Sequence, residues 1–319
     1  MSIRIGLGVA GFPWSSADAF LDWVDLCEDS DVDSVWFSER LVSSQPTLEP
    51  MVAMSLLAGR TRRLKFGMNA IVLPLRDPLV LAKECATLDY LSGGRLLPAF
   101  GVGRDTAPEF RATSNDGGGR GERSNEMLQL LSRLWSEEHV SFKGRYYDYE
   151  DTTISPRPVQ QPLPLWIGGS SAAAIKRTAL YGSGWLGGLQ SPAQVAPIIT
   201  AIKAAVAEAG RTIDEAHYGA GFSYRFGSWD EPVVQQSSAL LSRIGEGLDP
   251  STYMAVGGAG EIIARAREYV EAGVSKFVLR PIGATDEEIM EQTRRLADEV
   301  LPAVHDAAWE ANRAPVEIP

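Results

Sequence analysis

The chain has 319 residues, of which 45% are hydrophobic and 22% are charged, a balance typical of a water-soluble globular protein. Its formal net charge of −11 argues against nucleic acids and anionic membranes as partners, because both would be repelled. No apolar run reaches the roughly 20 residues that cross a bilayer, and residues 1–6 already resemble a strand. We therefore expect a cytoplasmic protein without a signal peptide.

Cysteine and histidine usage narrows the chemistry further. Cys27 and Cys85 fall in amphipathic helix patterns, so buried free thiols are expected rather than a disulfide. His139, His217 and His305 are the three histidines, and none has the spacing of a metal-binding motif. The sequence therefore predicts no metal site and argues against a metal hydrolase.

Short β-rich runs alternate with amphipathic helices along the whole chain. The first helix is capped by Ser15 or Ser16, Asp77-Pro78 opens another in cap-then-proline order, and Gly273 ends one. Predicted helices reach Ser30, cover Leu48–Gly59, end near Trp135 and cover Thr285–Ala308. The predicted strands are Ile3–Ala10, Ser34–Ser38, Leu64–Leu73, Leu96–Gly101, Leu163–Ile167, Gly184–Leu186, His217–Phe226 and Val274–Leu279.

Eight strand-then-helix units predict an α/β fold of the (β/α)8 TIM-barrel class, because alternating units form a parallel sheet with right-handed crossovers. Roughly 250 residues suffice for such a barrel. The surplus falls in Arg104–Pro162 and Trp229–Ala259, which we expect as insertions at the C-terminal face of a single domain, 1–319. A doubly wound open sheet is the alternative, but the glycine-rich turn after its first strand is missing.

A barrel gathers its active site at the C-terminal ends of its strands, and two early ends have unusual residues. Ser38-Glu39-Arg40 ends the second strand, where a carboxylate and a guanidinium could serve a ligand or simply brace the rim. Gly67–Pro74 places small residues inside the third strand, which indicates either close approach to a ligand or a tight barrel corner.

Two later strand ends carry groups that suit an anion. Gly101-Val102-Gly103-Arg104 leads into a stretch with Arg111, Arg120 and Arg123, although arginines also cover loops without any function. Trp166–Ser171 ends in Gly168, Gly169, Ser170 and Ser171 at a helix start, which could bind phosphate or provide an ordinary cap. No Ser-His-Asp or Cys-His set is evident, so we expect a cofactor to carry the reaction.

Several of these segments resemble one known family. Leu73–Asp105, reading LPLRDPLVLAKECATLDYLSGGRLLPAFGVGRD, is similar to the signature region of the luciferase-like monooxygenases and their deazaflavin-dependent relatives. DSVWFSERL (Asp33–Leu41), PLPLWIGGSS (Pro162–Ser171), the GSGWL segment ending at Leu186 and AGVSKFVLRP (Ala272–Pro281) follow in family order. The resemblance covers nearly the whole chain and implies the TIM barrel independently.

The resemblance also implies roles for particular residues. It places Glu39 and Arg40 beside a reactive ring as catalytic residues, and a non-proline cis peptide at Asn69–Ala70 behind that ring. It assigns the cofactor phosphate to Arg104 and the turn Gly168–Ser171, and the strand-end pattern adds Gly103 and Arg123 as expected cofactor-binding residues. Trp14 and Arg280 are expected to contact the substrate.

Two cofactors serve this family: reduced FMN, which activates oxygen, and the deazaflavin coenzyme F-420, which passes hydride. The RLLPAFGVG variant resembles the F-420 branch. Arg40 stands where the family usually has histidine, and Thr106 stands where sugar-phosphate dehydrogenases have a catalytic glutamate. These departures argue against the light reaction and the sugar-phosphate reaction.

The sequence therefore predicts an F-420-dependent oxidoreductase acting on a small organic substrate. One alternative is an FMN-dependent monooxygenase supplied by a separate flavin reductase. Another is a flavin-binding protein without turnover, in which side chains such as Trp14, Trp185 or Trp229 would fill the substrate space. A homodimer formed through barrel helices is also expected from the resemblance.

Overall fold

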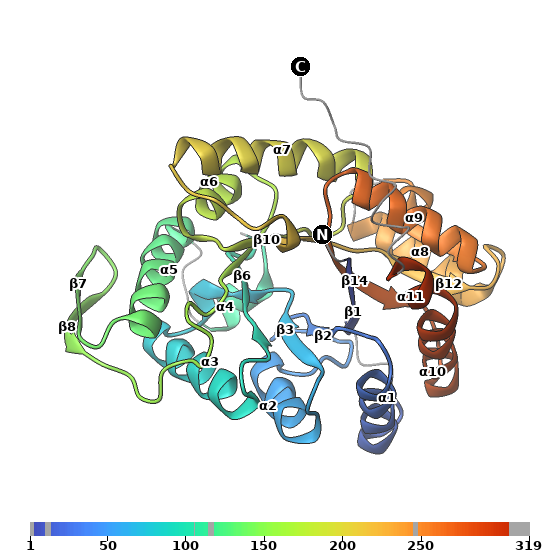
Figure 1. The fold of residues 1–319 in the computed structure, drawn as a ribbon, viewed down its shortest axis with the longest axis horizontal. Helices are drawn as coiled ribbons and strands as arrows, with labels where there is room; N and C mark the ends of the chain where they lie inside the picture. Colours follow the sequence, from blue (N-terminus) through green and yellow to red (C-terminus); the bar gives the residue numbers. More distant parts are fainter. Residues whose placement is uncertain (1–2, 10–13, 105, 114–117, 245–247, 306–319) are drawn as a thin grey trace.

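The computed structural model describes residues 3–9, 14–104, 106–113, 118–244 and 248–305. Within these ranges no helix is both long and apolar enough to span a membrane. The two cysteines, Cys27 and Cys85, are buried and free, as the sequence predicts. Figure 1 shows helices surrounding a central group of strands.

The central strands form a closed parallel barrel, which confirms the predicted fold. β14 pairs with β1, and the two halves of the third strand pair with the two halves of the fourth, so the ring of parallel strands closes. The barrel strands are β1 (Arg4–Val9), β2 (Ser34–Phe37), β3 (Lys65–Met68) with β4 (Ile71–Val72), β5 (Leu96–Leu97) with β6 (Ala99–Gly101), β9 (Trp166–Gly168), β10 (Gly184–Leu186), β11 (Tyr218–Ala220) with β12 (Ser223–Phe226), and β14 (Lys276–Pro281).

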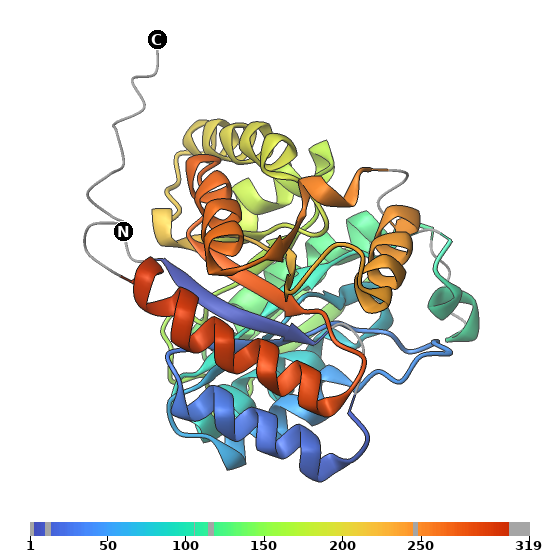
Figure 2. The ribbon, with the colours of Figure 1, turned by 90° about the vertical axis from the view of Figure 1, so that its right-hand side faces the viewer.

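The surrounding helices begin at the caps that the sequence indicates. Ser16 accepts a hydrogen bond from the Ala19 amide, and Asp77 accepts two from the first turn that Pro78 opens. In Figure 2 the first and last helices lie side by side. The helices are α1 (Ala17–Asp29), α2 (Pro50–Arg60), α3 (Pro78–Ser92), α5 (Arg120–Ser136), α6 (Ala172–Tyr181), α7 (Pro192–Glu208), α9 (Ala259–Glu271) and α10 (Asp286–Arg295), with a π-helical turn at Leu296–Val300 and α11 (Leu301–Val304).

Several predicted strands are shorter or broken for local reasons. The fifth strand begins at Trp166 rather than Leu163, because Pro164 has no amide hydrogen to donate to a neighbouring strand. The seventh strand is interrupted at Gly221, where a Cβ would lie 1.9 Å from the Val278 carbonyl oxygen. The predicted end of the last helix at Ala308 lies outside the described residues.

The two insertions differ in where they leave the barrel. Helix α4 (Pro108–Ala112) follows β6, but the hairpin of β7 (Val140–Lys143) and β8 (Asp148–Thr152) follows α5. The prediction that the whole first insertion follows a strand is therefore wrong, because the hairpin belongs to the connection from helix to strand. Figure 1 shows it outside α5. The second insertion follows β12 and adds α8 (Pro232–Ile244) and β13 (Met254–Gly257), which pairs with β12.

A buried charge pair closes the N-terminal end of the barrel. Lys276, at the start of β14, forms an ion pair with Asp33, and its side chain is only 4% exposed. Its ammonium group lies 5.7 Å from the centre of the Trp36 ring. Since Asp33 is the carboxylate that balances this buried ammonium group, the pair is a strong constraint on the barrel floor.

We predict that Asp33→Asn lowers the free energy of unfolding by about 3–5 kcal/mol, because it leaves the Lys276 ammonium buried without its counter-ion. Urea denaturation measures the change. Asp25→Asn is the matched control, since Asp25 pairs with Arg60 where both side chains are at least 40% exposed, and it should cost less than about 1 kcal/mol. Equal losses in the two variants would contradict the prediction.

Candidate cofactor and substrate site

Three pockets lie at the C-terminal ends of the barrel strands. The central pocket, of about 440 Å³, is lined by residues from the ends of β2, β3 and β6 and from α4, including Glu39, Arg40, Ala70, Arg104 and Glu109. The anion pocket, of about 760 Å³, is lined by Val102, the start of α5, Arg145, Tyr146 and the start of α6. The apolar pocket, of about 330 Å³, lies beside β1 and β14.

The floor of the central pocket is the peptide between Asn69 and Ala70, which is cis, as predicted. It separates β3 from β4. The Asn69 amide donates to the Phe37 carbonyl at 2.7 Å, and the Asn69 carbonyl accepts from the Ser38 hydroxyl at 3.2 Å. The second strand therefore fixes both sides of this residue.

Glycines keep the space around Ala70 open. A Cβ at Gly101 or Gly168 would lie 3.8 or 3.7 Å from the Ala70 methyl carbon, so side chains there would fill the space beside the floor. Gly103 has φ +70°, and a Cβ there would also lie 2.8 Å from Val72 Cγ1. Gly101, Gly103 and Gly168 thus leave a cradle near Ala70 that is free of their side chains.

Glu39 lines the central pocket, but its carboxylate is held by neighbouring groups. Val72 donates its amide hydrogen to Glu39 Oε2 at 2.6 Å, and Arg76 Nε donates to Oε1 at 3.0 Å. Arg76 also pairs with Glu49 at 2.5 Å. Burial opposes the charge on Arg76, yet Glu39 and Glu49 outweigh it and raise the pKa of its guanidinium. This arrangement braces β4, which agrees with the bracing alternative for this strand end.

Glu109 is a pocket residue that sequence reasoning missed. It lies in α4, is 5% exposed and lines the central pocket, and its buried Oε2 accepts no hydrogen bond from any described residue. A buried carboxylate oxygen without a donor is costly, so such groups often mark functional sites. Its only sequence signal is an acidic residue in a first helical turn. The predicted residues Arg40 and Arg104 are both exposed and line the same pocket.

Arginines of α5 and α6 line the anion pocket together with Glu122, which pairs with Arg145 at 2.8 Å. Ser171 caps α6 by accepting from the Ala174 amide at 3.2 Å, and it lines the pocket with Arg120 and Arg177. Arg177 Nε donates to Asn125 Oδ1 at 2.7 Å. Burial and then the charge of Arg120 lower the pKa of Arg177, so an anion here would relieve both effects. This geometry suits a phosphate group.

Other predicted phosphate ligands lie elsewhere. Arg123 donates to the Tyr147 hydroxyl at 2.8 Å and its guanidinium lies over that ring, so it joins α5 to the β7–β8 hairpin instead. The Gly169 carbonyl accepts from Trp185 Nε1 at 2.8 Å, and the Ser170 hydroxyl accepts from Gln190 at 3.4 Å. Arg177, which the sequence analysis did not select, stands on the wall of the pocket.

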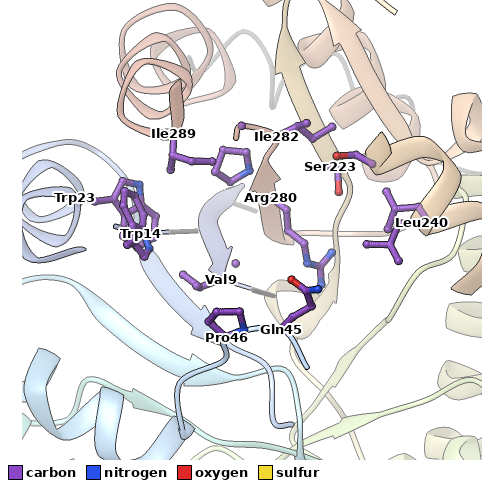
Figure 3. Close-up of a pocket in the computed structure, with 15 residues that line it drawn as sticks. Val9, Trp14, Trp23, Gln45, Pro46, Ser223, Leu240, Arg280, Ile282 and Ile289 are labelled. Carbon is purple, nitrogen blue, oxygen red and sulfur yellow. The ribbon is translucent and has the colours of Figure 1, made fainter. Parts of the chain in front are cut away.

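Both predicted substrate residues line the apolar pocket. Figure 3 shows Trp14 beside Trp23 on one side and Arg280 on the other, with Leu240 of α8 near Arg280. The Trp14 and Trp23 ring centres are 5.3 Å apart. In the described part of the chain, no group of three or more His, Cys, Asp or Glu side chains could hold a metal ion.

We predict that replacing each of two glutamates of the central pocket by glutamine has different effects on the free energy of unfolding. Glu39→Gln should lower the free energy of unfolding by about 3–5 kcal/mol, because it breaks a buried ion pair with Arg76. Glu109→Gln should leave stability unchanged or raise it, because Oε2 has no hydrogen bond to lose. Urea denaturation of both variants tests this, and a comparable loss in Glu109→Gln would overturn the functional interpretation of Glu109.

Comparisons with known proteins identify the family to which this chain is similar. The model of the family described as luciferase-like monooxygenase matches residues 4–303. An uncharacterised protein of Mycobacterium tuberculosis is 31% identical over 176 residues, which cover 55% of this chain and 60% of that protein. A protein of Amycolatopsis mediterranei named F-420-dependent glucose-6-phosphate dehydrogenase is 24% identical over 340 residues, covering 94% of this chain and 98% of that enzyme.

Solved structures share the fold. An F-420-dependent secondary alcohol dehydrogenase has a TM-score of 0.81 at 21% identity, with 96% of this chain and 100% of that chain covered. The oxygenating component of an FMN-bound 3,6-diketocamphane monooxygenase from Pseudomonas putida has a TM-score of 0.78 at 18% identity, with 95% and 99% covered. With a family match over nearly the whole length and this barrel, the chain belongs to the luciferase-like monooxygenase family.

Proposed function

We propose that this protein is an F-420-dependent oxidoreductase that transfers a hydride between coenzyme F-420 and a small organic substrate. The observation that carries the proposal is the glycine-lined cradle over the Asn69–Ala70 peptide, directly beside a pocket that suits phosphate. The naming of several relatives as F-420-dependent dehydrogenases supports the choice of cofactor.

The described residues fit such a cofactor. Its ring would lie in the central pocket against Ala70, and its phosphate would lie near Ser171, Arg177 and Arg104. When bound, the deazaflavin supplies or accepts the hydride. Val102 lines the anion pocket and Gly103 the central pocket, so one strand end joins the two parts of the proposed cofactor site.

The chain's own contribution to the chemistry would come from two groups of the central pocket. Arg40 is exposed there and can stabilise negative charge on a reacting oxygen. The Glu109 carboxyl can hold or deliver a proton, because none of the described residues forms a hydrogen bond with its Oε2. Glu39 has the different task of fixing β4 and the floor through Val72 and Arg76.

The alternatives make different demands on the same site. An FMN-dependent monooxygenase could use the same cradle and anion pocket, and FMN enzymes share the fold. A binding protein without turnover would have side chains in the substrate space. Here Trp14 leaves a pocket of about 330 Å³ open, Trp185 is fully buried, and Trp229 is 37% exposed. The open pocket favours an enzyme over a storage protein.

We retain a homodimer as part of the proposal. Exposed apolar side chains gather on α2 and α3, where Val52 is 71% and Leu91 is 69% exposed. A second copy covering these helices would remove that apolar surface from water. If FMN proves to be the cofactor, a separate flavin reductase becomes an expected partner.

We predict that the purified apo-protein binds F-420 and not FMN, as followed by the fluorescence of each compound during a titration. Saturable binding of F-420, with FMN at least tenfold weaker, supports the hydride-transfer proposal. Preferential binding of FMN would move the protein to the monooxygenase alternative.

We predict that Arg104→Ala and Arg177→Met each weaken cofactor binding by roughly 10- to 100-fold, because each removes a charge-assisted contact with the phosphate. The same titration measures the change. Arg111→Ala is the matched control, since Arg111 is exposed in α4 and lines neither pocket. Unchanged affinity in either of the two variants would reject the corresponding arginine as a phosphate ligand.

A further inference from the structure

The Arg280 guanidinium lines the apolar pocket and has no counter-ion among the described residues. It extends from the end of β14 across Gly8, where a Cβ would lie 3.3 Å from Arg280 Cγ. No described residue forms an ion pair or hydrogen bond with this guanidinium, and no described acidic residue lines the pocket. Burial lowers the pKa of Arg280, although Tyr269 opposes the effect. An arginine without a counter-ion is unusual in a protein whose net charge is −11.

The remainder of the pocket divides into an apolar part and a small polar part. Trp14, Ile289 and Leu240 are among its apolar walls. Gln45 and Ser223 add neutral polar groups, and Figure 3 shows the Gln45 amide and the Arg280 guanidinium pointing toward one another. Trp14 Nε1 is a buried donor that has no acceptor among the described residues. The walls thus favour a ligand with an apolar body and one anionic end.

We propose that the apolar pocket selects small apolar carboxylates, whose carboxylate pairs with Arg280 and whose hydrocarbon part contacts Trp14. The planar guanidinium matches a carboxylate in two parallel hydrogen bonds. A volume of about 330 Å³ is at the small end of ligand sites, so the substrate is a compact acid rather than a large polycyclic compound.

This inference rests on the proposed function, since it supplies the substrate class for that oxidoreductase. The apolar pocket includes Val9 at the end of β1, and the central pocket includes Ser38 just after β2, the strand that pairs with β1. An acid anchored at Arg280 would therefore lie at a strand end adjacent to the one that lines the proposed ring site. Arg280 is a binding and positioning residue in this account, and the reacting carbon lies elsewhere on the substrate.

The test is a calorimetric titration with hexanoate and benzoate, each compared with its uncharged amide, hexanamide and benzamide. Measurements use the protein alone and the protein with F-420 added. The acids should bind at least tenfold more tightly than their amides. Arg280→Met should remove that preference, with a loss of roughly 10- to 100-fold in acid affinity and little change for the amides.

Two further variants keep the test independent of folding. Arg280→Lys keeps the charge and should retain a weaker preference for the acids. Arg294→Met makes the same change as Arg280→Met on the outer surface of α10, where Arg294 is 51% exposed, and should leave binding unchanged. Equal binding of acids and amides to the unmodified protein, an unchanged preference in Arg280→Met, or no binding of the acids in either series would overturn the inference.

The outcomes separate this inference from the proposed function. Acid selectivity that depends on Arg280 in the protein alone supports the pocket assignment even if F-420 fails to bind, and the cofactor proposal alone then fails. Tight F-420 binding with no selectivity for acids would reject the substrate class and leave the cofactor proposal intact.

Discussion

The hydrogen-bonded brace between Glu39 and Val72 at the end of β4 is the constraint on which the site depends. The third barrel strand is broken at Asn69–Ala70, and its second half must still pair with β6. Glu39 accepts from the Val72 amide and pairs with Arg76, so the second strand holds both the broken peptide and the segment after it. Every other part of the proposed site is positioned relative to that floor.

Arginines line the pockets around this floor, although the net charge of the whole chain is negative. The chain carries a net −11, yet Arg40 and Arg104 line the central pocket, Arg177 lines the anion pocket and Arg280 lines the apolar pocket. The anion and apolar pockets at the two ends of the site therefore each contain arginines, which favours anionic ligands there, whereas Glu39 and Glu109 line the central pocket beside its arginines. The apolar walls near Trp14 also favour a ligand with a hydrocarbon part, which inorganic phosphate lacks.

Local pattern predicted the barrel and most strand positions, because these depend on neighbouring residues. The cis peptide, which the second strand holds, was predicted from the family resemblance alone. The partners of the charged side chains could not be predicted in this way, because they come from segments distant in the sequence. Arg123 and Arg177 carry the same charge near helix starts, but the β7–β8 hairpin supplies Tyr147 to Arg123, and α5 brings Asn125 to Arg177. The sequence likewise predicts a catalytic role for Glu39, whereas the structure shows its carboxylate in an ion pair with Arg76. Tertiary contacts thus decide which charged residues remain available for a ligand.

The measurement that tests the central claim most directly is a crystal structure of the protein with bound F-420. We expect the deazaflavin ring against Ala70, the phosphate within hydrogen-bond distance of Arg177 and Ser171, and the apolar pocket still open to substrate. A ring bound away from the Asn69–Ala70 peptide, or a phosphate held by Arg280, would contradict the proposed cofactor site.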